Sequence, residues 1–178
     1  GIIGAKGNNG KGISGVSQNI KIMAIKILDE DGSGYGSDEI SAYHYINKAL
    51  DLGVDVAAIN NSWGGGDSSE IFEKLVDLVG KKGAVTVCAA GNSSADNDDE
   101  GEFPSNIDSE YLLSVAASNE KGELAGFSNY GAGTVDLAAP GADILSTVSY
   151  NCYNPTLYDG SRQKSISQEF SDFEDDNT

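Results

Sequence analysis

Residues 85–92 end in a side chain whose type and position could serve a reaction. The stretch Val-Thr-Val-Cys-Ala has the composition of a buried strand, and Ala90, Gly91 and Asn92 follow it. An apolar run without polar alternation predicts a parallel strand covered on both faces, and ligands bind at the carboxyl ends of such strands. From there, Asn92 could donate a hydrogen bond to a developing oxyanion. The alternative interpretation is a turn asparagine that ends a core strand.

A second strand end carries residues of similar interest. Residues 54–60 predict a strand, which runs into Asn61, Ser62, Trp63 and Gly64. The alternation of strands and helices along the chain predicts right-handed crossovers and a parallel sheet, and therefore an α/β fold. We therefore expect residues 62–64 and 91–92 to lie at the same edge of adjacent strands.

Two helices and five further segments must position these strand ends. Residues 37–52 predict a helix that Ser37 caps and Gly53 ends, with a core face made by Ile40, Tyr43, Ile46 and Leu50. A second helix is predicted to begin with a capping box of Asp67 and Glu70 and to end at Gly83. Its predicted core face consists of Ile71, Phe72, Leu75, Val76 and Val79. Further strands are predicted at residues 20–28, 111–118 and 135–139, and acidic loops at 29–34 and 93–102.

Other reactive side chains have ordinary interpretations. His44, the only histidine, falls in the middle of a predicted helix beside its apolar face, as a boundary residue does. The acids at 29–31 lack the spacing of a calcium-binding EF-hand loop and indicate a solvated turn. The glycine-rich residues 7–12 precede a strand instead of following one, which argues against a nucleotide-binding α/β domain. Cys88 in a strand and Cys152 in a late loop predict no disulfide.

Length and charge limit the classes of protein further. The chain of 178 residues is long enough for one domain with a real core, and it has no apolar run long enough to span a membrane. A net charge of -17 argues against nucleic acid as a partner and suits an extracellular surface.

The order of several short motifs resembles the subtilisin-like serine proteases (subtilases, the S8 peptidases) over residues 1–160. The resemblance implies a three-layer α/β fold with a mainly parallel sheet, here truncated at both ends, in which residues 1–160 form the central part of the peptidase domain. The matching blocks are residues 12–16 (GISGV), 61–65 (NSWGG), 89–92 (AAGN), 103–105 (FPS), 127–131 (FSNYG) and 138–141 (AAPG).

The resemblance implies roles for particular residues. Asn92 matches the side-chain donor of the oxyanion hole, which makes it the catalytic residue expected in this chain. Two stretches match strands that hold an extended peptide between them by β-augmentation: Ser62, Trp63 and Gly64 on one side, and Gly32, Ser33 and Gly34 on the other. A wall of the primary specificity pocket is matched by Ala89, Ala90 and Gly91.

Two further roles follow from position within the motifs. The residue before Phe103 faces the base of the specificity pocket in the family, so Glu102 is expected to favour Lys or Arg before the scissile bond. A slightly unusual loop length leaves the alternative that Glu102 points to solvent. Asn9 falls in the family's calcium loop, so a structural calcium is an expectation, while the chemistry requires no cofactor.

The blocks of the family's Ser-His-Asp triad are not found in this sequence. The histidine block would directly precede Gly1, and the position of the nucleophile holds Arg162, with Ser161 beside it. Residues 161–178 are polar, acidic and without periodicity, and are expected to be disordered.

We therefore expect a fragment of a secreted serine endopeptidase that is inactive by itself. The expected partner is a polypeptide substrate of the complete enzyme, which is expected to be a monomer. The alternative is a pseudoprotease that keeps the peptide cleft as a binding module.

Overall fold

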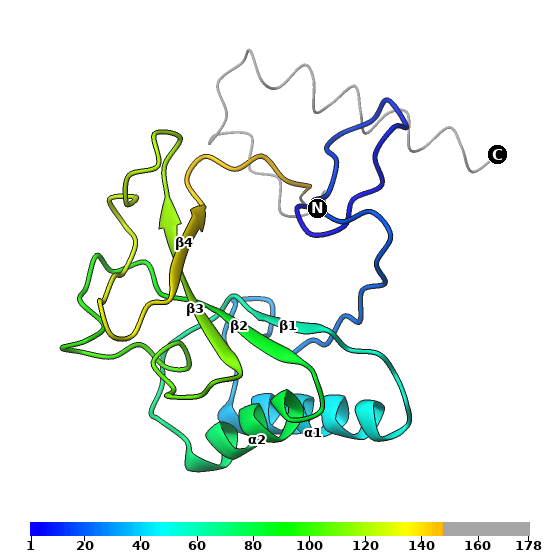
Figure 1. The fold of residues 1–178 in the computed structure, drawn as a ribbon, viewed down its shortest axis with the longest axis vertical. Coiled ribbons are helices and arrows are strands. Elements are labelled where there is room, and N and C mark those ends of the chain that lie inside the picture. Colours follow the sequence, from blue (N-terminus) through cyan, green and yellow to red (C-terminus); the bar gives the residue numbers. More distant parts are fainter. Residues whose placement is uncertain (148–178) are drawn as a thin grey trace. The chain divides into compact units, whose positions relative to one another are not determined.

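The computed structural model describes residues 1–147, which fall into two compact units. One comprises residues 25–144 and holds the helices and strands described below (Figure 1). The other comprises residues 1–24 together with the chain from residue 145 onward. The predictions for Cys152, Ser161, Arg162 and the tail at 161–178 lie outside the described residues, as does the end of the predicted domain at residue 160.

Four parallel strands form the sheet of the larger unit. They are β1 (Ala58–Asn61), β2 (Val85–Ala89), β3 (Leu112–Ser118) and β4 (Leu137–Pro140), in the order β1-β2-β3-β4. In register, Asn61 pairs with Cys88, and Cys88 pairs with Ser114. This confirms the predicted parallel α/β fold, although β1 and β4 each begin later than the apolar runs at 54 and 135 indicated.

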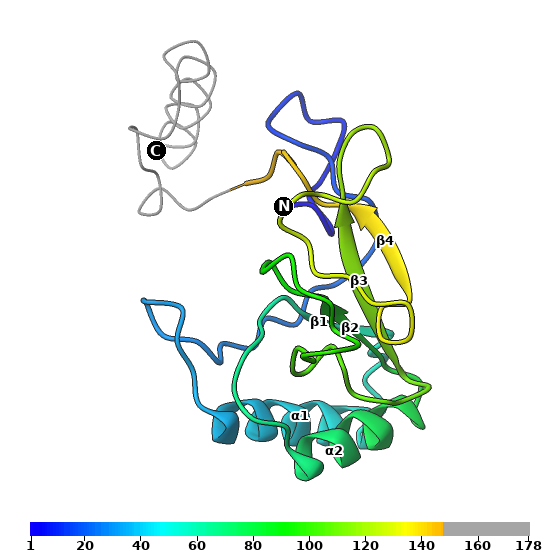
Figure 2. The same cartoon turned by 90° about the vertical axis from the view of Figure 1, so that its left-hand side faces the viewer.

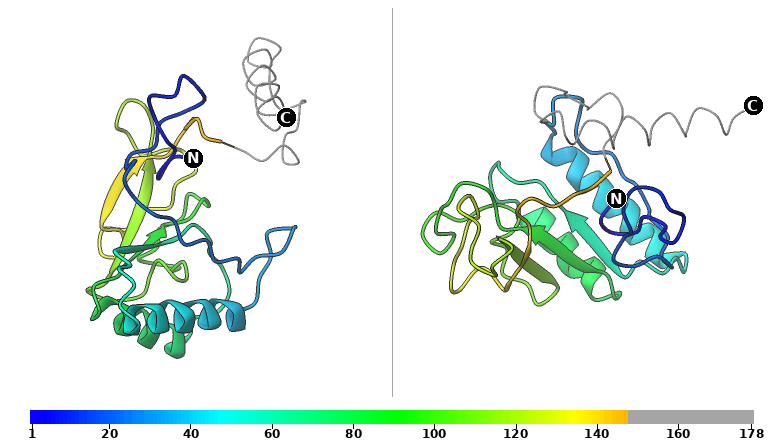
Figure 3. Two further views of the ribbon diagram at one scale, coloured as in Figure 1. Left: turned by 90° about the vertical axis from the view of Figure 1, so that its right-hand side faces the viewer. Right: turned by 90° about the horizontal axis from the view of Figure 1, so that it is seen from above.

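Both helices cover the same face of this sheet (Figures 1 and 2). They are α1 (Gly36–Asp51) and α2 (Glu70–Gly80), which Figure 3 shows from two further sides. Tyr43 and Ile46 of α1 are buried as predicted, with Ile40 and Leu50 partly buried beside them. The core consists of Tyr43, Ile46, Ile59, Phe72, Leu75, Val76, Val79, Ala84, Cys88, Phe103 and Leu112.

The opposite face of the sheet carries no helix within residues 25–144. Its side chains alternate with the buried ones along each strand, as the two-residue repeat of a strand requires. Val85, Leu113 and Leu137 point to this side, and each is 37–44% exposed. The described unit therefore contains two of the three layers expected for the fold.

A small buried polar cluster of Tyr43, Asn61 and Thr86 joins α1 to β1 and β2. The Asn61 side-chain amide donates to the Tyr43 hydroxyl at 2.8 Å, and the same hydroxyl lies 3.1 Å from Oγ1 of Thr86. Burial raises the pKa of Tyr43 to about 12, so the hydroxyl stays protonated at neutral pH and can donate as well as accept. These bonds hold the last residue of β1 in place, directly before Ser62.

The strand predicted at residues 20–28 is absent, which corrects the sequence analysis. Within this stretch the structure records a single isolated bridge, between Leu28 and Gly34. Ile20, Ile22 and Met23 are more than 40% exposed. An apolar composition favours a strand only when a neighbouring strand supplies backbone partners, and here none of the four strands pairs with it.

Both predicted helix starts also need correction. The Tyr35 carbonyl accepts the amides of Asp38 and Glu39, so Ser37 already lies inside the first turn of α1 and does not cap it. In α2 the N-cap is Ser69, and Glu70 pairs with Lys74 at 2.6 Å instead of completing a capping box with Asp67.

One residue of the predicted core face of α2 and the predicted end of this helix are also wrong. Ile71 lies on the solvent side of α2 with Leu78 and is 59% exposed. The helix stops at Gly80, three residues before the predicted Gly83, which has φ +102° in the following turn. Gly53, with φ +82°, follows α1 as predicted.

We expect Ser69→Ala to lower the free energy of unfolding by about 1 kcal/mol, because the Ser69 hydroxyl accepts the Phe72 amide at 3.3 Å and Phe72 is fully buried. Urea denaturation of both proteins measures the difference. Ser68→Ala is the matched control, since Ser68 is exposed and its hydroxyl makes no hydrogen bond within the described chain. Equal effects of the two substitutions would contradict the assignment of Ser69 as the cap.

Candidate functional site

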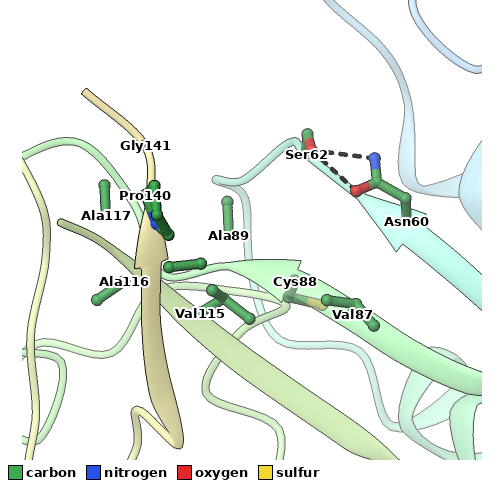
Figure 4. A pocket seen from close by; sticks show the side chains of 11 residues that line it. Asn60, Ser62, Val87, Cys88, Ala89, Val115, Ala116, Ala117, Pro140 and Gly141 are labelled. Carbon is green, nitrogen blue, oxygen red and sulfur yellow. Dashed lines mark hydrogen bonds between the residues drawn. The ribbon is translucent and has the colours of Figure 1, made fainter. Parts of the chain in front are cut away.

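The carboxyl ends of the strands meet at one edge of the sheet and surround a pocket of about 230 Å³ (Figure 4). It opens on the helix-free side, because its strand residues include Asn60, Val87, Ala89 and Val115, whose side chains point away from α1 and α2. Hydrogen bonds join the side chains of Asn60 and Ser62 at its rim. The pocket is lined by residues 87–89, 115–117 and 139–141 together with Asn60 and Ser62.

The backbone of residues 62–64 leaves β1 with its polar groups unpaired. No hydrogen bond to the backbone of Ser62, Trp63 or Gly64 occurs within the described chain. The indole ring of Trp63 fixes the stretch, since it packs edge-on against Phe72 and Phe103 at centroid distances of 5.8 and 6.3 Å. Unpaired amides and carbonyls in an anchored segment can add a strand from an extended peptide.

The chain turns sharply after β2, at the point where Asn92 follows. The Ala90 amide donates to the Val115 carbonyl at 2.9 Å, and Ala90 is buried. Gly91 has φ +117°, a conformation that side chains disfavour. Asn92 itself is exposed, and its side chain makes no hydrogen bond within the described residues. Its amide is therefore an uncommitted donor at the strand edge.

Residues 62–64 and 91–92 follow the carboxyl ends of the neighbouring parallel strands β1 and β2, as predicted. The register pairs Asn61 with Cys88, so Ser62 and Ala89 each follow one member of a pair. Sequence reasoning placed these stretches together correctly because parallel strands must end at a common edge.

Glu102 lies between the two glycines of these strand ends. A Cβ atom built on Gly64 would stand 2.5 Å from Oε1 of Glu102, and one on Gly91 would stand 3.3 Å from its Cγ. The side chain is half-buried. The side chain of Glu102 therefore lies against Gly64, which the resemblance assigns to the substrate-binding strand, and against Gly91, which it assigns to the wall of the specificity pocket.

Residues 32–34 are held within their own loop. The Ser33 carbonyl accepts the Asp29 amide at 2.7 Å, and the Asp29 carboxylate accepts the amides of Asp31 and Ser33 at 3.0 and 2.8 Å. This confirms the predicted turn. Among the described residues, no hydrogen bond joins Gly32, Ser33 or Gly34 to residues 62–64 or 89–92.

Asn9 lies in an exposed turn of the smaller unit. Its side-chain oxygen accepts the Lys11 amide at 3.0 Å, and the neighbouring Asn8 has φ +59°. Within residues 1–147, no group of three His, Cys, Asp or Glu side chains could hold a metal ion.

Two other side chains of reactive types do not suit a catalytic role. His44 is exposed in the middle of α1. Cys88 is a buried free thiol, and burial raises the pKa of this thiol to about 11. A thiol that stays protonated at neutral pH is a poor nucleophile.

The sequence analysis missed two buried asparagines at the site, Asn97 and Asn129, which are 4% and 0% exposed. Asn97 lies in the acidic loop predicted at 93–102, and Asn129 lies in the matching block at 127–131. Local sequence carries no signal for their burial, because their partners are 7 to 36 residues away along the chain.

Comparison with known proteins points to one family. A family model described as "Subtilase family" matches residues 1–170. The thermophilic serine proteinase of Bacillus sp. (strain AK1) is 39% identical over 153 residues, which cover 86% of this chain and 35% of that protein. The extracellular basic protease of Dichelobacter nodosus is 38% identical over 161 residues, covering 87% of this chain and 26% of that protein. The chain thus spans about a third or less of the length of these relatives.

Solved structures agree with the sequence comparison. A protease from Pseudoalteromonas arctica PAMC 21717 matches with a TM-score of 0.67 and 30% identity, over 79% of this chain and 42% of that chain. A cold-adapted subtilisin-like serine proteinase matches with a TM-score of 0.63 and 30% identity, over 73% of this chain and 44% of that chain. Among residues 1–147, no helix is long and apolar enough to cross a membrane.

Proposed function

The chain belongs to the subtilase family, and we propose that it is the central part of a secreted serine endopeptidase that cleaves extended polypeptides. The observation that carries this proposal is the exposed Asn92 amide, which has no partner within the described chain and stands at the carboxyl end of β2. When a serine oxygen attacks a peptide carbonyl carbon, negative charge develops on the carbonyl oxygen. A positioned amide N–H stabilises that charge more than it stabilises the uncharged substrate.

The substrate would bind as an added strand. Residues 62–64 offer unpaired backbone groups beside the pocket. Glu102, which lies against Gly64 and Gly91, would face the side chain of the residue before the scissile bond. Residues 32–34 would contact the other side of the peptide. The complete enzyme would act as a monomer and need no cofactor for its chemistry.

The nucleophile and the general base would come from sequence outside this chain. His44 is the only histidine here, and its exposed position on α1 does not suit a base at the carboxyl ends of the strands. The chain alone is therefore expected to be inactive. In the complete enzyme, a second layer of helices would cover the helix-free side of the sheet.

Sequencing the transcript across both ends of this chain, followed by expression of the complete product, tests the proposal. We expect the product to hydrolyse fluorogenic peptides and a fluorophosphonate reagent to abolish the activity by modifying one serine. This chain expressed alone is the control, and it should neither cleave the peptides nor react with the fluorophosphonate. Secretion is checked by assaying the culture medium against the cell fraction.

The alternative of a pseudoprotease predicts the opposite combination. In that case the complete product would bind extended peptides but would not cleave them, and no serine would react with the fluorophosphonate. That result would remove catalysis from the proposal and leave the peptide cleft as a binding module.

A further inference from the structure

Two buried asparagines hold the loop that carries Asn92 from both sides. Oδ1 of Asn129 accepts the backbone amides of Ser93 and Ala95, at 2.7 and 3.2 Å. The Asn129 backbone amide donates to the Gly91 carbonyl at 3.0 Å. Asn92 thus lies between two residues, Gly91 and Ser93, that are both hydrogen-bonded to Asn129, while its own side chain is left unbonded.

Asn97 completes the arrangement from within the loop. Nδ2 of Asn129 donates to Oδ1 of Asn97 at 2.9 Å, and Nδ2 of Asn97 donates to the Ala90 carbonyl at 2.8 Å. Both amide groups are thereby engaged on their oxygen and their nitrogen. Because a buried amide that loses its partner is costly to leave unsatisfied, the two side chains support a single conformation of the loop.

Neighbouring contacts attach this pair to the sheet. Oγ of Ser128 accepts the Ala117 amide of β3 at 2.8 Å and donates to the Asn129 carbonyl at 2.9 Å. At Gly91, any side chain would collide with the Asn129 amide, and the φ of +117° independently favours glycine there. Asn129 can therefore approach this closely only because residue 91 is glycine.

We propose that Asn129, acting with Asn97, is a positioning residue that fixes the orientation of Asn92 before substrate binds. This inference rests on the proposed function of Asn92 as the oxyanion donor. A donor that is already held in place stabilises the transition state without reorganising during the reaction. A loop released from Asn129 would leave Asn92 present but misdirected, so the loss would appear in kcat and would depend on Asn92.

A double-mutant cycle in the complete peptidase tests this dependence. We expect Asn129→Ala to lower kcat by about 10- to 100-fold, and to lower it less than about twofold when Asn92 is already alanine. Asn97→Ala, which removes the acceptor for Asn129 and the donor to Ala90 without burying a charge, should lower kcat with the same dependence on Asn92. Asn119→Ala is the matched control, because Asn119 also accepts two backbone amides, those of Lys121 and Glu123, but makes no hydrogen bond to residues 90–97 within the described chain, and it should leave kcat unchanged.

Equal losses of kcat in the two backgrounds would overturn the inference, because they would show a general structural role for Asn129. The inference would also be overturned if Asn129→Ala left kcat unchanged both in the native enzyme and in the Asn92→Ala variant. If Asn92→Ala alone left kcat unchanged, the proposed oxyanion role of Asn92 would fail. This result differs from the one that would contradict the positioning role of Asn129, so the experiment distinguishes the two.

Hydrogen exchange gives a readout that does not need activity. In this chain, the amides of Ser93 and Ala95 should exchange faster in Asn129→Ala than in the native sequence, while the Ala90 amide, bonded to Val115, should change little. Unchanged exchange at Ser93 and Ala95 would show that Asn129 does not hold the loop. Should Asn129→Ala fail to fold, the Asn97→Ala variant decides the question by both measurements.

Discussion

Asn92→Ala is expected to lower kcat of the complete peptidase by about 100- to 1000-fold while leaving KM nearly unchanged. The structure gives the physical reason. The Asn92 amide is exposed at the carboxyl end of β2 and has no other partner within the described chain, so its removal breaks no contact of the resting protein. Its interaction would form only when charge develops on the substrate oxygen, which affects the transition state and not the ground state.

The measurement is steady-state kinetics on a peptide substrate, with the thermal midpoint recorded for each variant. Ser93→Ala is the matched control: Ser93 is the next residue, it is also exposed, and the backbone amide that bonds to Asn129 is retained. A rise in KM at unchanged kcat would contradict the oxyanion role and would place Asn92 in substrate binding. A large fall in thermal stability would show that Asn92 is a structural turn residue.

The second large effect is expected at Glu102. Glu102→Gln should lower kcat/KM for peptides with Lys or Arg before the scissile bond by about 10- to 100-fold, because a charge-assisted hydrogen bond is replaced by a neutral one. Peptides with Phe at that position should be cleaved with little change. The carboxylate lies against Gly64 and Gly91, at the two strand ends that border the proposed specificity pocket.

A matched control separates this local contact from the overall charge of the protein. The chain carries a net charge of -17, which attracts basic peptides over a distance. Glu100→Gln removes one negative charge from the same loop at an exposed position, and it should reduce cleavage of basic peptides only slightly. An equal preference of the native enzyme for Phe and Arg peptides, or equal effects of the two substitutions, would contradict the assignment of Glu102.

Several features of the fold could be predicted from local sequence. The helix face of Tyr43 and Ile46, the strands around Val87 and Val115, and the meeting of residues 62–64 with 89–92 are confirmed. Periodicity of apolar residues and the position of glycines encode these features directly. One error falls where a segment depends on a distant partner, since residues 20–28 pair with none of the four strands. Another is local: Ser69, and not Asp67, caps α2, because several neighbouring residues could serve as the cap.

By itself, the sequence determined the family, the parallel α/β architecture and the position of Asn92 at a strand end, because each of these follows from short motifs and their order. Only the tertiary structure decided what holds Asn92 and what Glu102 faces. Asn97 and Asn129 are typical loop residues by composition, and they become buried because their amides satisfy backbone groups across 7 to 36 residues of sequence. Such long-range hydrogen bonds exist only once the strands have brought the loops together, so no local pattern records them.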